Sequence, residues 1–127
     1  MEKNDYNKID LSVVVLGYQA GQELKLFINE LITFLEKDNI NYQIVLVGNY
    51  WSESKDITPE IVKEIAESNK RIKPIIMQKK GAMGWDMQRG LENADGKFIA
   101  VIDGDGQMPS FDIIRVYVKI KEDNLLL

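Results

Sequence analysis

The feature that most constrains this chain is the alternation of short apolar runs with segments whose apolar residues recur every three or four positions. Short β-branched runs predict strands buried on both faces, and the longer spacing predicts amphipathic helices. We expect strands over 11–16, 42–47, 72–77 and 97–102, and helices over 24–37, from 58, over 83–94 and from 110. This order predicts an α/β fold, with a mainly parallel sheet, right-handed crossovers and helices on both faces.

The composition fits one globular domain and removes several classes of chemistry. Of 127 residues, 45% are hydrophobic, which is enough to bury a core. The absence of cysteine and histidine excludes disulfides, thiol catalysis, Ser-His-Asp hydrolysis and histidine-ligated metals. A net charge of −4 gives no general attraction to nucleic acid. Acid–base or metal chemistry must therefore use carboxylates, lysines, tyrosines and the backbone.

The two ends of the chain differ from the part between them. Residues 1–10 are polar and charged, unlike a signal peptide, and no apolar run is long enough to cross a membrane. We expect an N-terminal extension over 1–10, one domain over 11–127, and a cytoplasmic location, peripheral at the inner face of the membrane in a longer protein. Residues 124–127 resemble the start of another strand. We therefore expect a domain truncated at its C-terminal end, with an exposed edge through which copies associate; the alternative is a tail packed on the sheet edge.

The strongest functional pattern follows the fourth expected strand. Ligands of parallel sheets bind beyond the carboxyl ends of the strands, here the loops over 17–22, 48–56, 78–84 and 103–109. Asp103 and Asp105 are separated by a glycine, so both carboxylates can approach one hard cation while the backbone turns sharply. The pattern predicts an Mg²⁺ or Mn²⁺ site at these two residues. An acidic turn or a calcium loop is the alternative, although an EF-hand would need a glutamate that is missing.

Three stretches, 12–18, 42–47 and 90–109, resemble the donor-binding half of family 2 nucleotide-sugar glycosyltransferases, in particular the polyprenyl-phosphate sugar transferases. The resemblance implies a Rossmann-like GT-A fold and an inverting transfer that uses Mg²⁺ or Mn²⁺. It also implies a UDP- or GDP-linked sugar donor and a polyprenyl-phosphate or glycan acceptor. By this resemblance Asp105 binds the metal that bridges the donor diphosphate, and Asp103 lies near the ribose and the metal.

The first two loops depart from the pattern of that family. The usual Pro-x-Tyr-Asn-Glu keeps only Tyr18, and the usual Asp-Asp-Gly-Ser is replaced by Gly-Asn-Tyr-Trp at 48–51. Asn49 stands where a carboxylate reads the base, and its side-chain oxygen can still accept a hydrogen bond from a pyrimidine N–H. Trp51 or Tyr50 can stack on the base, with ordinary packing as the alternative. We expect Tyr18, Asn49 and Trp51 to bind the donor nucleotide.

The third loop supplies positive charge. Lys79 and Lys80 can offset the charge of the donor phosphates, and we assign Lys80 to the donor site, with a solvated turn as the alternative. In the helix that follows, Asp86 and Arg89 are spaced to pair on the surface. Nothing after Pro109 resembles the family's acceptor-side base. Either the base lies outside this chain, or the acceptor is a phosphate that needs little deprotonation.

Three functions are compatible with these residues. The leading interpretation is metal-dependent, inverting sugar transfer, with this chain inactive by itself. The second is a non-catalytic nucleotide-binding domain of the same fold, which fits the altered first and second loops. The third is a sugar-phosphate nucleotidyltransferase, whose usual glycine-rich opening loop does not match 17–22.

Overall fold

The computed structural model describes residues 9–106 and 109–122. Its elements are β1 (Leu11–Leu16), α2 (Glu23–Lys37), β2 (Tyr42–Val47), α3 (Thr58–Glu67), β3 (Ile72–Ile75), α4 (Met83–Glu92), β4 (Phe98–Asp103) and α5 (Phe111–Glu122). Each lies within a few residues of its predicted range, so the predicted order of elements is confirmed. The strand expected at 124–127 and most of the N-terminal extension lie outside the described residues.

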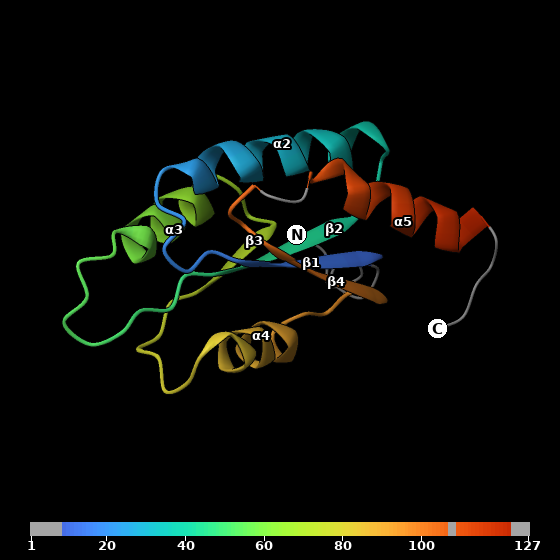
Figure 1. Ribbon diagram of the computed structural model, residues 1–127. Coiled ribbons are helices and arrows are strands. Elements are labelled where there is room, and N and C mark those ends of the chain that lie inside the picture. The colour runs from blue at the N-terminus through green and yellow to red at the C-terminus, as the bar shows by residue number, and fades with distance from the viewer. Residues whose placement is uncertain (1–8, 107–108, 123–127) are drawn as a thin grey trace.

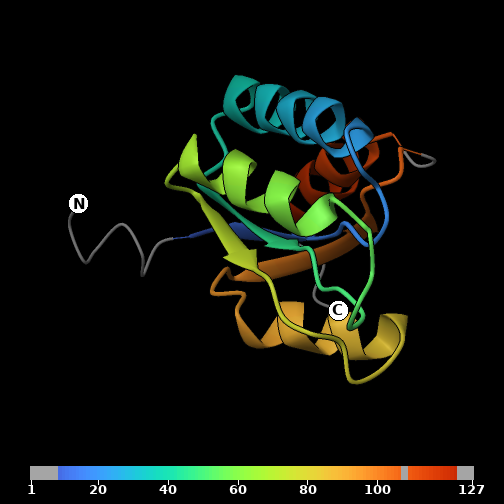
Figure 2. The ribbon, with the colours of Figure 1, turned by 90° about the vertical axis from the view of Figure 1, so that its left-hand side faces the viewer.

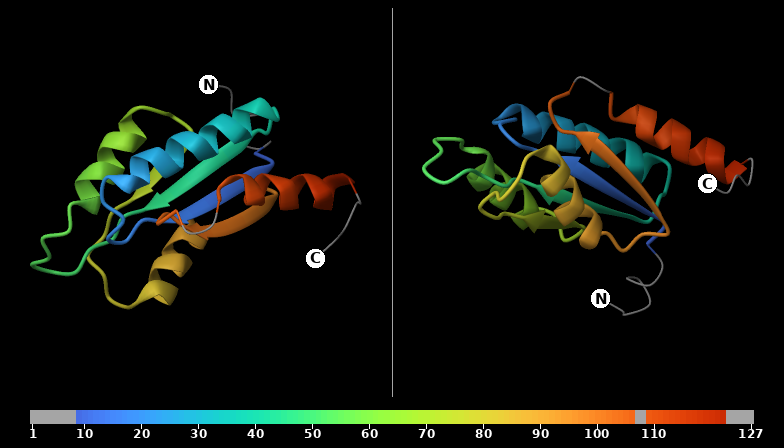
Figure 3. Two further views of the ribbon diagram at one scale, coloured as in Figure 1. Left: turned by 45° about the horizontal axis from the view of Figure 1, so that its top comes forward. Right: turned by 60° about the horizontal axis from the view of Figure 1, so that its bottom comes forward.

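The four strands form one parallel sheet in the order β3-β2-β1-β4. Helices α2, α3 and α5 cover one face, and α4 covers the other (Figures 1 and 3). Alternate residues of a strand point to opposite faces. In β1, Val13 and Val15 join the larger core cluster on the α2 side, whereas Val14 and Leu16 join the smaller cluster that includes Met87 of α4. The predicted α/β fold with helices on both faces is confirmed.

Strand β4 lies at an edge of the sheet and is less covered than its neighbours. Its register with β1 places Val101 beside Val14, on the face that α4 covers. Helix α4 packs against β1 and β2, however, and Ile99 and Val101 stay exposed. On the opposite face an open groove lies between β4 and α5, where the Phe98 and Tyr117 rings pack in a T-shaped arrangement. This edge therefore exposes apolar surface.

Helix α4 approaches the sheet closely because residue 90 is glycine. A Cβ built at Gly90 would lie 2.4 Å from Val14 Cγ1 and 3.2 Å from Val47 Cγ2. Both neighbours are β-branched side chains with little rotamer freedom, so neither can turn away at low cost. Gly90 thus sets the distance between the sheet and α4, which also carries Asp86 one turn earlier.

Replacing Gly90 with alanine should lower the free energy of unfolding by about 1–3 kcal/mol, because the added methyl group overpacks the interface between α4 and the sheet. Gly84 in the same helix is a matched control, since a Cβ built there meets nothing within 4 Å. Gly84→Ala should be neutral or stabilise by up to about 1 kcal/mol through helix propensity. Urea unfolding of both variants measures the difference. A Gly90→Ala variant as stable as the parent would contradict the packing argument.

Tyr42 begins β2, at the end of the sheet opposite the loops that follow the strands. Its hydroxyl donates to Glu36 Oε2 at 2.9 Å and accepts from Asn69 Nδ2 at 3.2 Å. Burial raises the pKa of Tyr42; the hydrogen bond from Asn69 opposes the rise, and the Glu36 carboxylate adds to it. The folded protein therefore favours the neutral phenol.

This pKa shift makes the stability fall at alkaline pH. Because the folded pKa lies above the ordinary tyrosine value of about 10, the stabilisation is fully present below about pH 10 and is lost as the pH rises through the folded value. Tyr42→Phe should lose about 1–2 kcal/mol near neutral pH and should show a shallower alkaline decline than the parent. Urea unfolding at a series of pH values tests both expectations. Parallel alkaline limbs in the two proteins would refute the assignment.

Candidate functional site

The four loops predicted to carry function leave the sheet from one level row. The register aligns the residues that end the strands, which are Leu16, Val47, Ile75 and Asp103. The backbone ladder continues beyond them, because Gly17 N–H donates to the Val47 carbonyl at 2.7 Å and Gly104 N–H donates to the Leu16 carbonyl at 2.8 Å. The loops therefore gather at one edge of the molecule, which faces the viewer in Figure 2.

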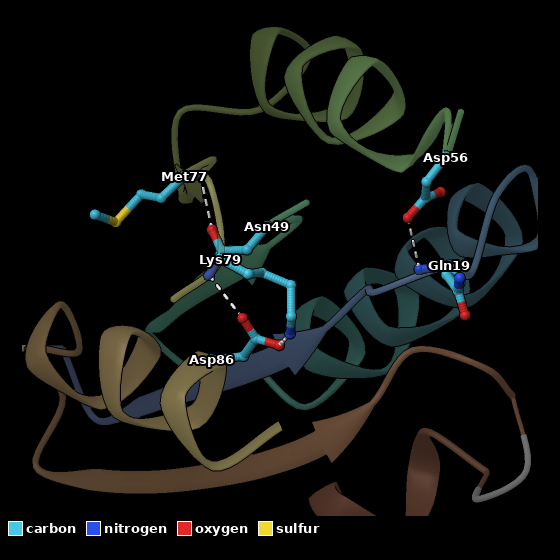
Figure 4. Close-up of polar contacts among 6 residues, drawn as sticks. All are labelled: Gln19, Asn49, Asp56, Met77, Lys79 and Asp86. Atoms are coloured by element: carbon cyan, nitrogen blue, oxygen red, sulfur yellow. Dashed lines mark hydrogen bonds and ion pairs between the residues drawn. The ribbon is translucent and has the colours of Figure 1, made fainter. Parts of the chain in front are cut away.

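Asp86, in the first turn of α4, is the centre of a buried polar cluster at this edge. The residue is 3% exposed, and its two carboxylate oxygens have different partners. Oδ1 accepts from Asn49 Nδ2 at 2.9 Å, and Oδ2 forms an ion pair with Lys79 Nζ (Figure 4). Asp86 lies in the first turn of the helix, where the free backbone N–H groups give the N-terminus a partial positive charge.

Asn49 joins the second loop to the third. The residue is 1% exposed, and its side-chain oxygen accepts from Met77 N–H at 2.8 Å while its amide nitrogen donates to Asp86. The oxygen that the sequence assigns to the nucleotide base is thus already the acceptor of one internal hydrogen bond. A carbonyl oxygen has a second lone pair, and the contact with a nucleotide stays a prediction.

Lys79 links three of the loops. It is 5% exposed, which is rare for a lysine and requires a partner for its charge. Besides Asp86, the ammonium nitrogen lies 4.5 Å from the ring centroid of Tyr18 and 5.4 Å from that of Trp51, within the range of cation–π attraction. Tyr18 and Trp51 remain 37% and 42% exposed. Tyr18 and Trp51, both predicted to bind the nucleotide, therefore contact the same buried cation. Both rings also keep part of their surface exposed to solvent.

The first loop is also anchored to the start of α3. Gln19 has a left-handed backbone, with φ of 57°, and its N–H donates to Asp56 Oδ2 at 3.1 Å (Figure 4). Gly21 N–H donates to Thr58 Oγ1 at 3.2 Å. These two contacts fix the backbone on either side of Ala20, so Tyr18 extends from a held loop rather than a free one.

The predicted metal residues lie at the end of β4. Asp103 and Asp105 are both exposed, and Gly104 between them is buried. A Cβ at Gly104 would lie 2.6 Å from Leu24 Cδ1 and 3.1 Å from Val15 Cγ1, and Gly106 has φ of 81°. The turn that carries the two carboxylates therefore requires glycine twice, at Gly104 for close packing and at Gly106 for a left-handed backbone.

These two residues fit a cation that shares its ligands with a substrate. Within 9–106 and 109–122, no group of three or more Asp, Glu, His or Cys side chains gathers where it could hold a metal ion. Mg²⁺ and Mn²⁺ favour oxygen ligands, and Mg²⁺ in particular is commonly held by one or two carboxylates together with substrate phosphates. The chemistry of Asp103 and Asp105 suits that arrangement and does not suit a site built from protein ligands alone.

The ion pairs of α4 differ from the prediction made from the sequence. The predicted surface pair of Asp86 with Arg89 is wrong: Arg89 Nε lies 3.0 Å from Glu92 Oε1, and Asp86 points inward to Lys79. The signal available was Gly90, which lies four residues after Asp86 and so on the same, sheet-facing side of the helix. Lys79 is buried and Lys80 is exposed, and nothing in the sequence distinguishes the two lysines. The exposure of Lys80 is also what a solvated turn would give.

No helix in the part of the chain that the structure describes has the length and apolar character needed to cross a membrane.

Comparisons with known proteins match nearly the whole chain. The chain is 26% identical over 121 residues to a dolichyl-phosphate beta-glucosyltransferase of Dictyostelium discoideum, which covers 90% of this chain and 36% of that protein. It is 23% identical over 113 residues to the putative glycosyltransferase CsbB of Bacillus subtilis, which covers 89% of this chain and 33% of that protein. The chain thus spans about a third of the length of these relatives.

A solved structure and a family model agree with these relatives. The crystal structure of S. aureus TarS 1-349 matches with a TM-score of 0.62 and 23% identity over 89% of this chain and 32% of that one, which supports the fold. The model of the family described as glycosyl transferase family 2 matches residues 12–126. Since that match covers the sheet, its helices and all four loops at the carboxyl ends, the chain belongs to glycosyl transferase family 2.

Proposed function

We propose that this chain is the donor-binding part of an inverting, metal-dependent transferase that moves a sugar from a UDP- or GDP-linked donor to a polyprenyl phosphate. Membership of the family supports a nucleotide-sugar donor. The name of the Dictyostelium relative, a dolichyl-phosphate beta-glucosyltransferase, supports a polyprenyl-phosphate acceptor. The observation that carries the proposal is the pair Asp103 and Asp105 at the end of β4, level with the loops that hold Tyr18 and Trp51.

The nucleoside lies across the carboxyl ends of β1, β2 and β4 in this proposal. The exposed ring surfaces of Tyr18 and Trp51 suit the flat face of a base. Asp103 ends β4 beside Leu16, and we assign it to accept hydrogen bonds from the ribose. Asn49 contributes from the inner side, through its remaining oxygen lone pair and through the backbone of the second and third loops that it holds together.

The diphosphate is assigned to residues of the loops after the two outer strands, β4 and β3. Asp105, with Asp103, would hold the Mg²⁺ or Mn²⁺ ion, which when bound offsets the negative charge that develops on the leaving diphosphate. Lys80 is exposed and is assigned to the same charge. Lys79 is not assigned to the diphosphate, because its ammonium already forms an ion pair with Asp86.

A phosphate acceptor removes the need for a strong base. An acceptor phosphate is already ionised near neutral pH, so its oxygen can attack the anomeric carbon while the bond from that carbon to the donor diphosphate breaks. Attack from the side opposite the leaving group gives inversion, and the nucleoside diphosphate departs. The contribution of this chain is to hold the donor in position for that attack.

The metal assignment predicts that a nucleoside diphosphate and the cation bind together. Titration calorimetry should show UDP or GDP binding at least about 10-fold tighter with Mn²⁺ than without it. Asp105→Asn should remove most of that gain, whereas Asp38→Asn, at the opposite end of the sheet, should keep it. Equal affinity with and without Mn²⁺, unchanged in Asp105→Asn, would refute the assignment.

The exposed face of β4 predicts association between copies of this chain. Exposed apolar side chains on an edge strand favour pairing with another chain. Val101→Lys should therefore lower the association constant measured by sedimentation, because it places a charge on that face. Leu26→Lys, which places the same charge at an exposed apolar residue of α2, is the control. A parent chain that stays monomeric at high concentration would contradict this prediction.

A further inference from the structure

The buried ion pair of Lys79 and Asp86 has no role in the donor contacts assigned above, yet it lies directly behind them. We propose that Asp86 and Lys79 are positioning residues of the donor site. Asp86 holds the Lys79 ammonium against the rings of Tyr18 and Trp51, so that two loops present their aromatic faces together to the base of a nucleotide. This inference rests on the proposed function and adds to it the residues that order the base-binding surface.

The ion pair is hard to explain by stability alone. Burying two charges costs as much desolvation energy as their attraction returns, so a well-packed apolar pair of similar size is often as stable. Lys79 and Asp86 are 5% and 3% exposed, so both carry that cost. A buried lysine at this place has one property that an apolar side chain lacks, which is attraction to the faces of nearby aromatic rings.

The rings that the ammonium attracts come from two different loops. Tyr18 follows β1 and Trp51 follows β2, and the Lys79 nitrogen lies 4.5 and 5.4 Å from the two ring centroids. Both rings are more than one third exposed, at 37% and 42%. Lys79 is therefore a contact that the two rings share, and a flat ligand can meet the surface that remains open.

Asp86 also fixes the backbone that leads to Trp51. Through Asn49 it orients the amide that accepts from Met77 N–H. Beside that contact the second and third loops continue the sheet pattern, since Tyr50 N–H donates to the Met77 carbonyl at 3.0 Å and Lys79 N–H donates to the Tyr50 carbonyl at 2.7 Å. One carboxylate thus holds both the cation and the backbone that precedes the Trp51 ring.

The decisive variant removes both charges without leaving one of them buried alone. Lys79→Met with Asp86→Asn keeps the approximate volume of each side chain, and the new amide oxygen can still accept from Asn49. Single substitutions are less informative, because each strands a buried charge and lowers stability for that reason. Lys79→Arg keeps a cation that can face the rings, and Lys73→Met makes the same change at an exposed lysine in β3.

Three measurements are made on each protein: the temperature of thermal unfolding, the affinity for UDP and GDP with Mn²⁺, and the quenching of Trp51 fluorescence by acrylamide. The chain has two tryptophans, so the fluorescence is measured in a Trp85→Phe background. We expect the double variant to unfold within a few degrees of the parent. It should bind nucleotide at least about 10-fold more weakly and expose Trp51 to more quenching. Lys79→Arg should recover most of the affinity, and Lys73→Met should match the parent throughout.

Each other outcome counts against the inference. A double variant with parental affinity and parental quenching would show that the pair serves the fold alone. A double variant that unfolds far below the parent, with Lys79→Arg failing to recover binding, would also overturn it. If the parent binds neither UDP nor GDP, the proposed function fails with the nucleotide part of this inference. The ordering of the rings then stands or falls on Trp51 quenching in the double variant.

Discussion

The central position of β1 is the constraint on which the rest of this structure depends. Because β1 pairs in parallel with β2 on one side and β4 on the other, one register fixes the level of three strand ends at once. The apolar residues on its two faces then need cover from both sides, which α2 and α4 provide. A shift of one residue would turn each of those faces toward the wrong helix layer. The level edge that carries the loops is therefore a consequence of burying β1.

A level edge brings polar loops together, and their backbone groups need partners. The structure meets this need differently on its two sides. On the β2 and β3 side, Asn49, Lys79 and Asp86 form a buried network of hydrogen bonds and an ion pair within the protein. On the β4 side, Asp103 and Asp105 are exposed around a glycine turn. One half of the edge is ordered by internal charge, and the other leaves carboxylates in reach of solvent and ligand.

Much of the fold could be predicted because its signals are periodic and local. The buried runs at 11–16 and 42–47 and the helical spacing after them specified the order of elements, and the parallel sheet followed from handedness and connection length. The carboxylates after β4 could be placed at the functional edge for the same reason. The burial of individual strands could not be predicted. Ile99 and Val101 belong to a segment whose sequence resembles a buried strand, yet α4 leaves both side chains exposed.

The cluster around Asp86 shows why the rest of the site could not be predicted from the sequence. Spacing along a helix says which residues are neighbours, but Asp86 has suitable neighbours in two directions, Arg89 on the surface and Lys79 across the edge. The choice depends on how closely α4 approaches the sheet, which Gly90 permits through its contact with Val14. That contact joins residues far apart in the sequence, and local pattern carries no information about it.

The same cluster gives a physical reason for the altered second loop. In the family pattern a carboxylate stands where this chain has Asn49. Asn49 Nδ2 lies 2.9 Å from an oxygen of Asp86, so an aspartate here would place two carboxylates in direct contact inside the protein. Two like charges about 4 Å apart repel by about 4 kcal/mol even at an effective dielectric constant near 20. The amide at position 49 and the acid at position 86 are therefore coupled. The second loop lacks a negative charge at position 49, and Asp86 of α4, in contact with Asn49, carries a negative charge instead. That charge pairs with Lys79.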